Sequence, residues 1–328
     1  MGFRIDPILI NKVESEKYHM SQFAFFFPGQ GSQSVGMMSG LADLAIVKQT
    51  FVEASDTLKV DFWSMVNEPN ELLNLTQHTQ PLMLTAGVAT WRAYQQLDGA
   101  MPAVMAGHSL AEYTALVAAG ALRFEDALPL VRYRAEVMQH AVPEGKGGMA
   151  AILGLEDDLV REVCLEAANG EVVEAVNFNS PGQVVIAGEK SAIDRAVEVA
   201  KAKGAKRVIA LSVSVPSHCA LMKPAAKQLA EYLKTVKMQV PSIPVLQNAD
   251  VASYREVGAI QDALARQLYS PVRWVETVQA VYRQGITMSA ECGPGKVLSG
   301  LVKRSVPELT CIALVDVPSL NEFVENNK

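Results

Sequence analysis

Several features that would place this chain in a familiar functional class are absent from its sequence. No apolar run approaches the roughly 18 residues that a membrane-spanning helix needs, so we expect no membrane association. The net charge is −6, which gives no electrostatic basis for binding nucleic acid. The four cysteines lie far apart without a Cys-x-x-Cys pair. This spacing fits neither a metal site nor a secreted disulfide framework, and it predicts a reducing, cytoplasmic location.

Phosphate-binding loops are also absent. The glycine-rich segment 28–33 follows a predicted strand but matches neither Gly-x-x-x-x-Gly-Lys-Ser/Thr nor Gly-x-Gly-x-x-Gly. The later segment 293–296 ends in a lysine with no serine or threonine after it. We therefore expect no nucleoside triphosphate site, no metal and no resident cofactor.

The composition suits a packed globular enzyme. The chain has 328 residues, 49% hydrophobic and 20% charged, which is enough for one large domain and a second, smaller one. Residues 1–20 mix charged and isolated apolar side chains and lack the continuous apolar core of a secretory signal. We interpret them as an N-terminal extension without chemistry of its own.

A parallel sheet covered by helices is the architecture that most of the chain predicts. Short apolar runs are followed by turns and then by helical patterns, an order typical of α/β proteins. We assign residues 21–144 and 212–328 to this large domain. The expected strands are Phe23–Phe27, Ala103–Ala106, Ile243–Leu246, Thr287–Glu291 and Cys311–Val315, and the clearest helices are Gln80–Gln96, Ala111–Ala119 and Phe124–Gln139.

Residues 145–211 have a different pattern, strand–helix–strand–strand–helix–strand. That order is typical of a ferredoxin-like module, so we expect a small α+β domain inserted into the large one. Its expected strands are Met149–Leu153, Val172–Val176, Gln183–Ala187 and Arg207–Leu211, and its helices are Asp157–Ala168 and Ser191–Lys203.

Ser109 is the first candidate catalytic residue. It lies in the string GHSLA (107–111), between a predicted strand and a predicted helix. A tight turn there would project the hydroxyl from the sheet, as in a nucleophile elbow, and the helix N-terminus would stabilise a developing oxyanion. The alternative is a serine that only caps the helix. Ala111 departs from the strict Gly-x-Ser-x-Gly form of the elbow.

A nucleophilic serine needs a base, and the chain has five histidines. His218 is the best placed, because it lies in a loop that enters a helix and can meet the edge of the sheet. A purely structural histidine is the alternative. Two interpretations of Arg134 also remain. It is either a solvated arginine on a helix surface or an inward-facing guanidinium that pairs with a substrate carboxylate.

Seven segments, taken in order, resemble the bacterial malonyl-CoA:acyl carrier protein transacylase family. The likeness runs from about Ser21 to about Val315, and seven motifs in one order are highly specific. The segments are FPGQGSQ (27–33), TQP (79–81), GHSLAEY (107–113), NFNSPGQVVIAG (177–188), VSVPSHCALMKPA (213–225), RQLYSPVRW (266–274) and ECGPGKVLSGL (291–301).

The resemblance implies an α/β-hydrolase-like large domain and a role for each site residue. Ser109 would be the nucleophile and His218 its general base. The backbone N–H groups of Gln30 and Leu110 would form the oxyanion hole. Arg134 would bind the malonyl carboxylate, and the main-chain carbonyl of Gln267 would orient the histidine in place of a triad aspartate.

The same resemblance implies a reaction and its partners. A malonyl group would pass from malonyl-CoA, through a malonyl-serine ester, to the phosphopantetheine thiol of acyl carrier protein in fatty-acid biosynthesis. Coenzyme A would be a substrate group and not a cofactor, and we expect a monomer. Ala111 stands where the family usually has glycine, so acyl preference or turnover could shift slightly.

Carrier proteins are typically acidic, and this chain is acidic overall, so docking needs a local basic patch. Lysines and arginines at solvated helix ends would look the same in the sequence. The candidates are Lys201, Lys203, Lys206 and Arg207 in one cluster, with Lys223, Lys303 and Arg304 as others.

Three competing functions remain open at this point. A serine esterase or thioesterase would use the same serine and histidine but deliver the acyl group to water. A binding module without catalysis, or an acyltransferase domain from a polyketide synthase, would also match parts of the pattern. The absence of an obvious triad acid and the presence of Arg134 favour transfer over hydrolysis.

Overall fold

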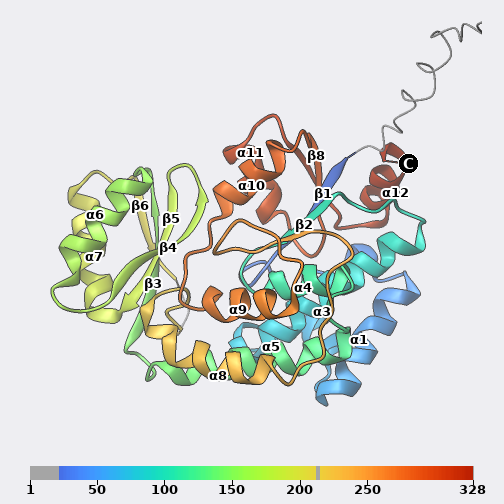
Figure 1. Ribbon diagram of the computed structural model, residues 1–328, viewed down its shortest axis with the longest axis horizontal. Helices are drawn as coiled ribbons and strands as arrows, with labels where there is room; N and C mark the ends of the chain where they lie inside the picture. Colours follow the sequence, from blue (N-terminus) through green and yellow to red (C-terminus); the bar gives the residue numbers. More distant parts are fainter. Residues whose placement is uncertain (1–21, 212–214, 328) are drawn as a thin grey trace, which may run out of the picture.

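Two separate β-sheets organise the molecule. The computed structural model describes residues 22–211 and 215–327, so the expected extension 1–20 lies outside the described residues. One sheet is parallel and has five strands, and the other is antiparallel and has four. Figure 1 shows the small sheet with helices α6 and α7 at one end of the molecule and the large sheet at the other.

The large sheet has the strand order β7-β2-β1-β8-β9, and all its pairs are parallel. Its central strand β1 is buried at every residue, as expected for a strand covered on both faces. The strands are β1 (Phe23–Phe27), β2 (Val104–Gly107), β7 (Val245–Leu246), β8 (Met288–Glu291) and β9 (Thr310–Ala313).

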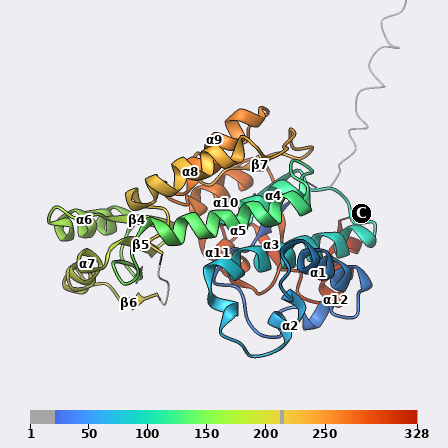
Figure 2. The same cartoon turned by 90° about the horizontal axis from the view of Figure 1, so that it is seen from below.

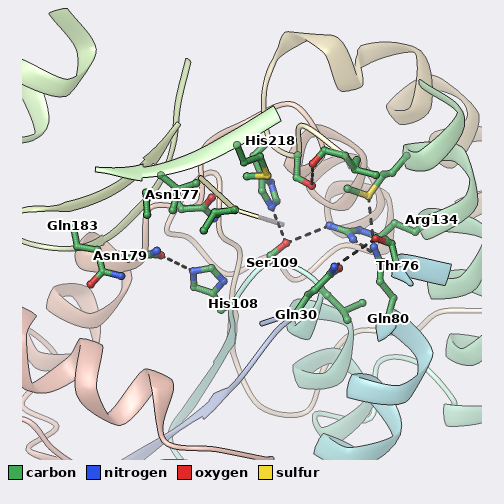
Figure 3. Close-up of a pocket in the computed structure, with 18 residues that line it drawn as sticks. Gln30, Thr76, Gln80, His108, Ser109, Arg134, Asn177, Asn179, Gln183 and His218 are labelled. Atoms are coloured by element: carbon green, nitrogen blue, oxygen red, sulfur yellow. Dashed lines mark hydrogen bonds between the residues drawn. The ribbon is translucent and has the colours of Figure 1, made fainter. Parts of the chain in front are cut away.

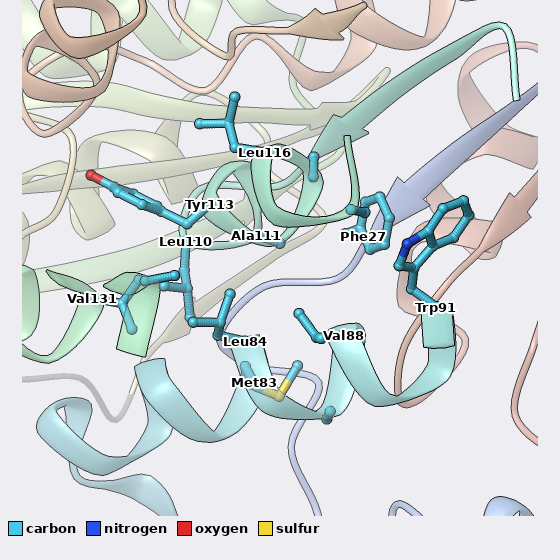
Figure 4. Close-up of a cluster of buried hydrophobic side chains, with 14 of the residues drawn as sticks. Phe27, Met83, Leu84, Val88, Trp91, Leu110, Ala111, Tyr113, Leu116 and Val131 are labelled. Carbon is cyan, nitrogen blue, oxygen red and sulfur yellow. The ribbon is translucent and has the colours of Figure 1, made fainter. Parts of the chain in front are cut away.

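Alternation along β1 sends side chains to both faces of this sheet. Phe23, Phe25 and Phe27 join the larger apolar core, beneath helices that include α1, α3, α4, α5 and α12. Ala24 and Phe26 join a second core, beneath α10 and α11. Figure 4 shows the first core around Phe27, where α3 and α4 pack together.

The helices lie on both sides of the large sheet and on one side of the small one (Figure 2). They are α1 (Ala45–Leu58), α2 (Phe62–Asn67), α3 (Thr76–Gln96), α4 (Ala111–Ala118), α5 (Phe124–Ala141), α6 (Asp157–Ala168), α7 (Lys190–Ala202), α8 (Lys223–Leu233), α9 (Val257–Gln267), α10 (Trp274–Tyr282), α11 (Val297–Ser305) and α12 (Val317–Asn326), with short 3-10 helices η1 (Ser39–Leu41), η2 (Leu72–Asn74) and η3 (Ala220–Met222).

The small sheet has the strand order β4-β5-β3-β6 and the expected sequence of strands and helices. Alternate residues of β3 separate its two faces: Ala150 and Ile152 pack beneath α6 and α7, whereas Met149 and Ala151 face the other way and line a cavity. The strands are β3 (Gly147–Leu153), β4 (Val173–Ser180), β5 (Gln183–Glu189) and β6 (Arg207–Ala210).

Some boundaries differ from the sequence prediction because tertiary pairing extends or shortens the elements. Strand β4 continues to Ser180, beyond the expected end at Val176, because it keeps pairing with β5 and also bridges to Val272. Strand β7 is only two residues long, because it pairs with β2 over that length alone. Helix α3 begins at Thr76, one turn before the expected Gln80.

Candidate active site

Ser109 lies in a strained turn between β2 and α4. Its φ is +53°, in the left-handed region that residues other than glycine rarely adopt. The turn is tight enough to require Gly107, since a Cβ there would overlap the carbonyl of Ala111. Gly29 is required for the same reason, because a Cβ there would overlap the carbonyl of His108. This is the geometry of the expected nucleophile elbow.

His218 is in contact with Ser109, across 109 positions of sequence. The Oγ of Ser109 lies 2.7 Å from Nε2 of His218, and Nδ1 of His218 lies 2.8 Å from the main-chain oxygen of Gln267, the last residue of α9. A carbonyl oxygen can only accept, so Nδ1 carries the ring proton and donates it to Gln267. Nε2 is therefore the unprotonated nitrogen and accepts the Ser109 hydroxyl.

The protonation state of His218 follows from its burial. The side chain is 3% exposed, and burial lowers its pKa to about 3, with the positive charge of Arg134 acting in the same direction. The hydrogen bond to the Gln267 carbonyl raises the pKa but does not offset the burial. The ring is therefore neutral near pH 7 and available as a base.

Arg134 points into the protein, so the interpretation as a solvated surface arginine is wrong. The residue is 1% exposed on α5. Nη1 donates to Oε1 of Gln80 at 2.9 Å, Nη2 donates to Oε1 of Gln267 at 2.9 Å, and Nη2 lies 3.5 Å from Oγ of Ser109. Among the described residues, no carboxylate forms an ion pair with this guanidinium, and its Nε has no hydrogen-bond partner.

These groups surround a cavity of about 290 Å³ between the two sheets. In Figure 3, Ser109 lies between His218 and Arg134, and Gln30 and Gln80 lie on the Arg134 side. Residues of the small sheet, including Asn177, Asn179 and Val185, form the opposite wall. Gln30 and Leu110 also line the cavity, and in the described part of the chain their backbone N–H groups have no acceptor.

Several buried polar residues of the site were not predicted from the sequence. Asn248 accepts the Ser109 N–H through Oδ1 at 2.6 Å and donates to the Gly107 carbonyl through Nδ2 at 2.7 Å. The Asn248 N–H in turn donates to Oε2 of Glu112 at 2.7 Å. Burial raises the pKa of Glu112 to about 7, and the hydrogen bond from Asn248 acts against that rise. Only the position of Asn248 just after a predicted strand hinted at this role.

His108 is a second site residue whose role the sequence left undefined. Its Nε2 lies 2.8 Å from Oδ1 of Asn179 on β4, and its ring packs against Trp274. Burial lowers the pKa of His108. The turn that carries the serine is thus tied to the small sheet as well as to the large one.

Metal and membrane features can be reported for the described residues only. Within residues 22–211 and 215–327, no group of three or more His, Cys, Asp or Glu side chains is arranged to hold a metal ion. Over the same ranges, no helix combines the length and the apolar character needed to cross a membrane.

Comparison with known proteins identifies the family. The family model described as an acyl transferase domain matches residues 24–317. The malonyl CoA-acyl carrier protein transacylase of Salmonella typhimurium is 55% identical over 304 residues, covering 92% of this chain and 98% of that protein. The chain belongs to the malonyl CoA-acyl carrier protein transacylase family.

Solved structures agree with this assignment. The acyl-carrier-protein S-malonyltransferase of Burkholderia pseudomallei is 57% identical, with a TM-score of 0.91 over 93% of this chain and 99% of that one. A malonyl-transacylase solved in complex with its type II PKS acyl-carrier protein is 52% identical, with a TM-score of 0.92 over 94% of this chain and 100% of that one. The chain is thus an acyltransferase by family, and Ser109 lies at the centre of its cavity.

Proposed function

We propose that this chain transfers a malonyl group from malonyl-CoA to the phosphopantetheine thiol of an acyl carrier protein in fatty-acid biosynthesis, through a malonyl ester on Ser109. One observation carries the proposal. The Ser109 hydroxyl lies between a neutral histidine nitrogen at 2.7 Å and a buried guanidinium at 3.5 Å. That arrangement supplies a base for the nucleophile and a cation for an acyl group that ends in a carboxylate.

In the first half-reaction, Ser109 attacks the thioester carbonyl carbon of malonyl-CoA. Nε2 of His218 takes the hydroxyl proton while the new C–O bond forms. The N–H groups of Gln30 and Leu110, both at the cavity wall, hold the oxyanion. The C–S bond then breaks, His218 returns the proton to the leaving sulfur, and coenzyme A departs.

The second half-reaction reverses these roles. The thiol of the carrier protein's phosphopantetheine arm attacks the malonyl-Ser109 ester, and its proton passes to Nε2 of His218. The C–O bond to Oγ breaks, and His218 returns the proton to Ser109. The Gln267 carbonyl, 2.8 Å from Nδ1, keeps the ring oriented through both halves.

Arg134 would select the acyl group. Its guanidinium is desolvated and contacts neutral amide oxygens, so a malonyl carboxylate would provide the missing negative charge. An acetyl group brings no such charge and leaves the cation unpaired.

Transfer to holo acyl carrier protein is the direct test of this function. We expect malonyl-CoA to yield malonyl-carrier protein, with release of free malonate at a much lower rate. The Ser109→Ala variant is the matched control and should form no product. Rapid release of malonate without transfer to the thiol would instead identify a hydrolase.

Docking of the carrier protein is a further part of the proposal, and we place it at a groove beside the active-site cavity. The groove is lined by Lys206 and Arg304 and meets the cavity at Gln183, which lines both. Arg304 contacts only neutral oxygens of Ser180 and Gln183 among the described residues. Lys201 and Lys203, by contrast, are paired with glutamates. The groove also contains Glu156, so its two cations are not its only charges.

The double variant Lys206→Ala/Arg304→Ala tests this docking surface. We expect a rise of about tenfold in the KM for carrier protein, a loss of its salt dependence, and an unchanged rate with free pantetheine as acceptor. The variant Lys227→Ala/Lys237→Ala removes the same charge from two exposed positions and serves as the control. Equal effects of both double variants would rule out the groove.

The finer description of the fold belongs to the same proposal. We assign an α/β-hydrolase-like large domain to residues 21–144 and 212–328, and a ferredoxin-like domain to residues 145–211, supported by the strand orders of the two sheets. We also propose a monomer, as expected from the sequence. The four free thiols are compatible with the cytoplasmic location expected from the sequence.

A further inference from the structure

We propose that Asn248 is a positioning residue that holds the Ser109 turn in its strained shape and thereby determines which backbone N–H groups face the substrate. The inference rests on the proposed acyl transfer. It concerns a residue that touches neither the acyl group nor the base, and that acts through the backbone of the nucleophile.

The sheet register brings Asn248 to the turn. Strands β2 and β7 are parallel neighbours, with Met105 opposite Val245 and Ala106 opposite Leu246. Their carboxyl ends therefore leave the sheet together, and the residues just after β7 lie beside the turn just after β2. A strand of only two residues is enough to place Asn248 beside the turn, because the pairing of β7 with β2 fixes where β7 ends.

The Asn248 amide clamps both sides of the turn. Oδ1 accepts the N–H of Ser109 at 2.6 Å, and Nδ2 donates to the carbonyl of Gly107 at 2.7 Å. An amide can do both at once because it has one accepting and one donating end. These bonds span the residue with φ of +53°, a conformation that persists only where its surroundings enforce it.

The clamp also restricts the choice of oxyanion donors. With its N–H bound to Asn248, Ser109 cannot donate to a substrate oxygen, whereas the N–H of Leu110 has no acceptor among the described residues. The Ser109 carbonyl is occupied as well, by Nε2 of Gln267 at 2.9 Å. Among the described residues, the backbone donor of this turn that remains free is therefore the N–H of Leu110, a residue that lines the cavity.

The clamp itself is anchored in the protein interior. Asn248 is 1% exposed, and its N–H donates to Oε2 of the fully buried Glu112 on α4. Its carbonyl accepts the N–H of Arg273 at 3.3 Å. The backbone of Asn248 thus has fixed partners on both sides, which leaves its side chain little freedom to follow a relaxing turn.

Asn248→Ala and Asn248→Asp test the proposal by single-turnover acylation with malonyl-CoA. Loss of the clamp should slow acylation at saturating malonyl-CoA by about 10²-fold, with little change in the half-saturating concentration. Gln247→Leu is the matched control, because Gln247 is an adjacent, equally buried amide whose side chain, among the described residues, bonds to the nearby carbonyl of Val245 and not to the Ser109 turn. It should acylate at the wild-type rate even if its melting temperature falls.

The pH dependence of Asn248→Asp separates positioning from mere stability. An ionised aspartate can accept from Ser109 but repels the Gly107 carbonyl, whereas the protonated acid can accept from one and donate to the other. Its acylation rate relative to wild type should therefore rise about tenfold from about pH 8 to about pH 5. The charged groups facing this position are Glu112 from α4, Arg273 at the start of α10, Asp250 with its partner Arg266 of α9, and His218 and Arg134 through Ser109. All of them are shared by the wild-type reference.

The outcomes are distinguishable from failure of the proposed function. No acylation by the wild-type protein would overturn acyl transfer itself. Wild-type acylation with both Asn248 variants within about threefold of it would overturn the clamp alone. So would a flat ratio for Asn248→Asp across this pH range, whether or not Asn248→Ala folds.

Discussion

Arg134 is the residue on which, in the proposed function, acyl selectivity depends. Its guanidinium is 1% exposed and is held by amide oxygens of Gln80 and Gln267, at 2.9 Å each. Because the guanidinium is already desolvated, pairing with a substrate carboxylate requires only the carboxylate to lose its hydration. The malonyl group has such a carboxylate and the acetyl group does not.

Replacement of this side chain should therefore affect the two substrates differently. We expect Arg134→Ala to lower kcat/KM for malonyl-CoA by the equivalent of about 2–5 kcal/mol and to leave the slow use of acetyl-CoA nearly unchanged. Arg132→Ala, two positions away on the same helix and paired with Glu136, is the control. A similar loss with both substrates would contradict selection by charge.

The imidazole of His218 should stay neutral across the physiological pH range. Burial and Arg134 lower its pKa to about 3, so it does not bind a proton near its ordinary value of 6.5. In the unfolded chain, the imidazole of His218 does bind a proton near that ordinary value. Its contribution to stability is therefore complete above that ordinary pKa and is lost as the pH falls below it.

Nuclear magnetic resonance of the imidazole ring can check this directly. We expect the His218 ring signals to remain unchanged from about pH 8 to about pH 5, and a His218→Gln variant assigns them. A midpoint near the ordinary value would show that the ring is solvated, which contradicts the burial described above.

What the sequence could predict at this scale depended on local motifs. Ser109 and His218 lie in short motifs whose residue types indicate a turn before a helix, so the sequence alone singles out both as candidates. The inward orientation of Arg134 could not be decided from residues 130–137, because it depends on Gln80 and Gln267, which belong to α3 and α9. Asn248 was missed because its bonds are to backbone atoms more than 130 positions away in the sequence.

At the scale of elements, the turn between β2 and α4 is the most constrained segment of the site. Gly107 is needed because any Cβ would overlap backbone atoms of Ala111 and Glu112. Ala111 itself is 1% exposed and belongs to the larger core, so its methyl group has a place beneath the helix (Figure 4). The departure from glycine at this position is therefore accommodated by packing.

Gly107→Ala should consequently abolish acylation. The added Cβ forces β2 and α4 apart and moves Ser109 away from His218, so a fall of about 10²-fold or more is expected even in protein that folds. The variant Gly258→Ala is the control, because a Cβ there has open space. Wild-type acylation rates in Gly107→Ala would show that the tight turn is not required.

The prediction of elements succeeded where hydrophobic patterns were long and failed where pairing between distant segments set the length. The all-apolar β1 and the amphipathic α6 have the bounds expected from their patterns. The mostly polar residues 177–180 gave no strand signal, yet they extend β4 because β5 and Val272 supply partners. Asn177 and Asn179 line the cavity, whereas Phe178 between them packs in the core beneath α6 and α7. The cavity wall thus accounts for the two asparagines in this strand.

At the scale of the whole molecule, the cavity exists because two sheets meet. The large sheet contributes Ser109 just after the carboxyl end of β2, and the small sheet contributes the opposite wall through β3, β4 and β5. His108 and Asn179 join the two across the cavity at 2.8 Å. The groove with Lys206 and Arg304 adjoins this cavity at Gln183, so the proposed docking surface and the proposed site of acyl transfer are neighbours.

The most direct test of acyl transfer is the intact mass of the protein after brief mixing with malonyl-CoA. We expect a gain of one malonyl group in the wild-type protein, no gain in Ser109→Ala, and loss of the adduct on addition of holo acyl carrier protein. An adduct that persists in Ser109→Ala, or turnover of malonyl-CoA without any adduct in the wild-type protein, would contradict a malonyl-serine intermediate.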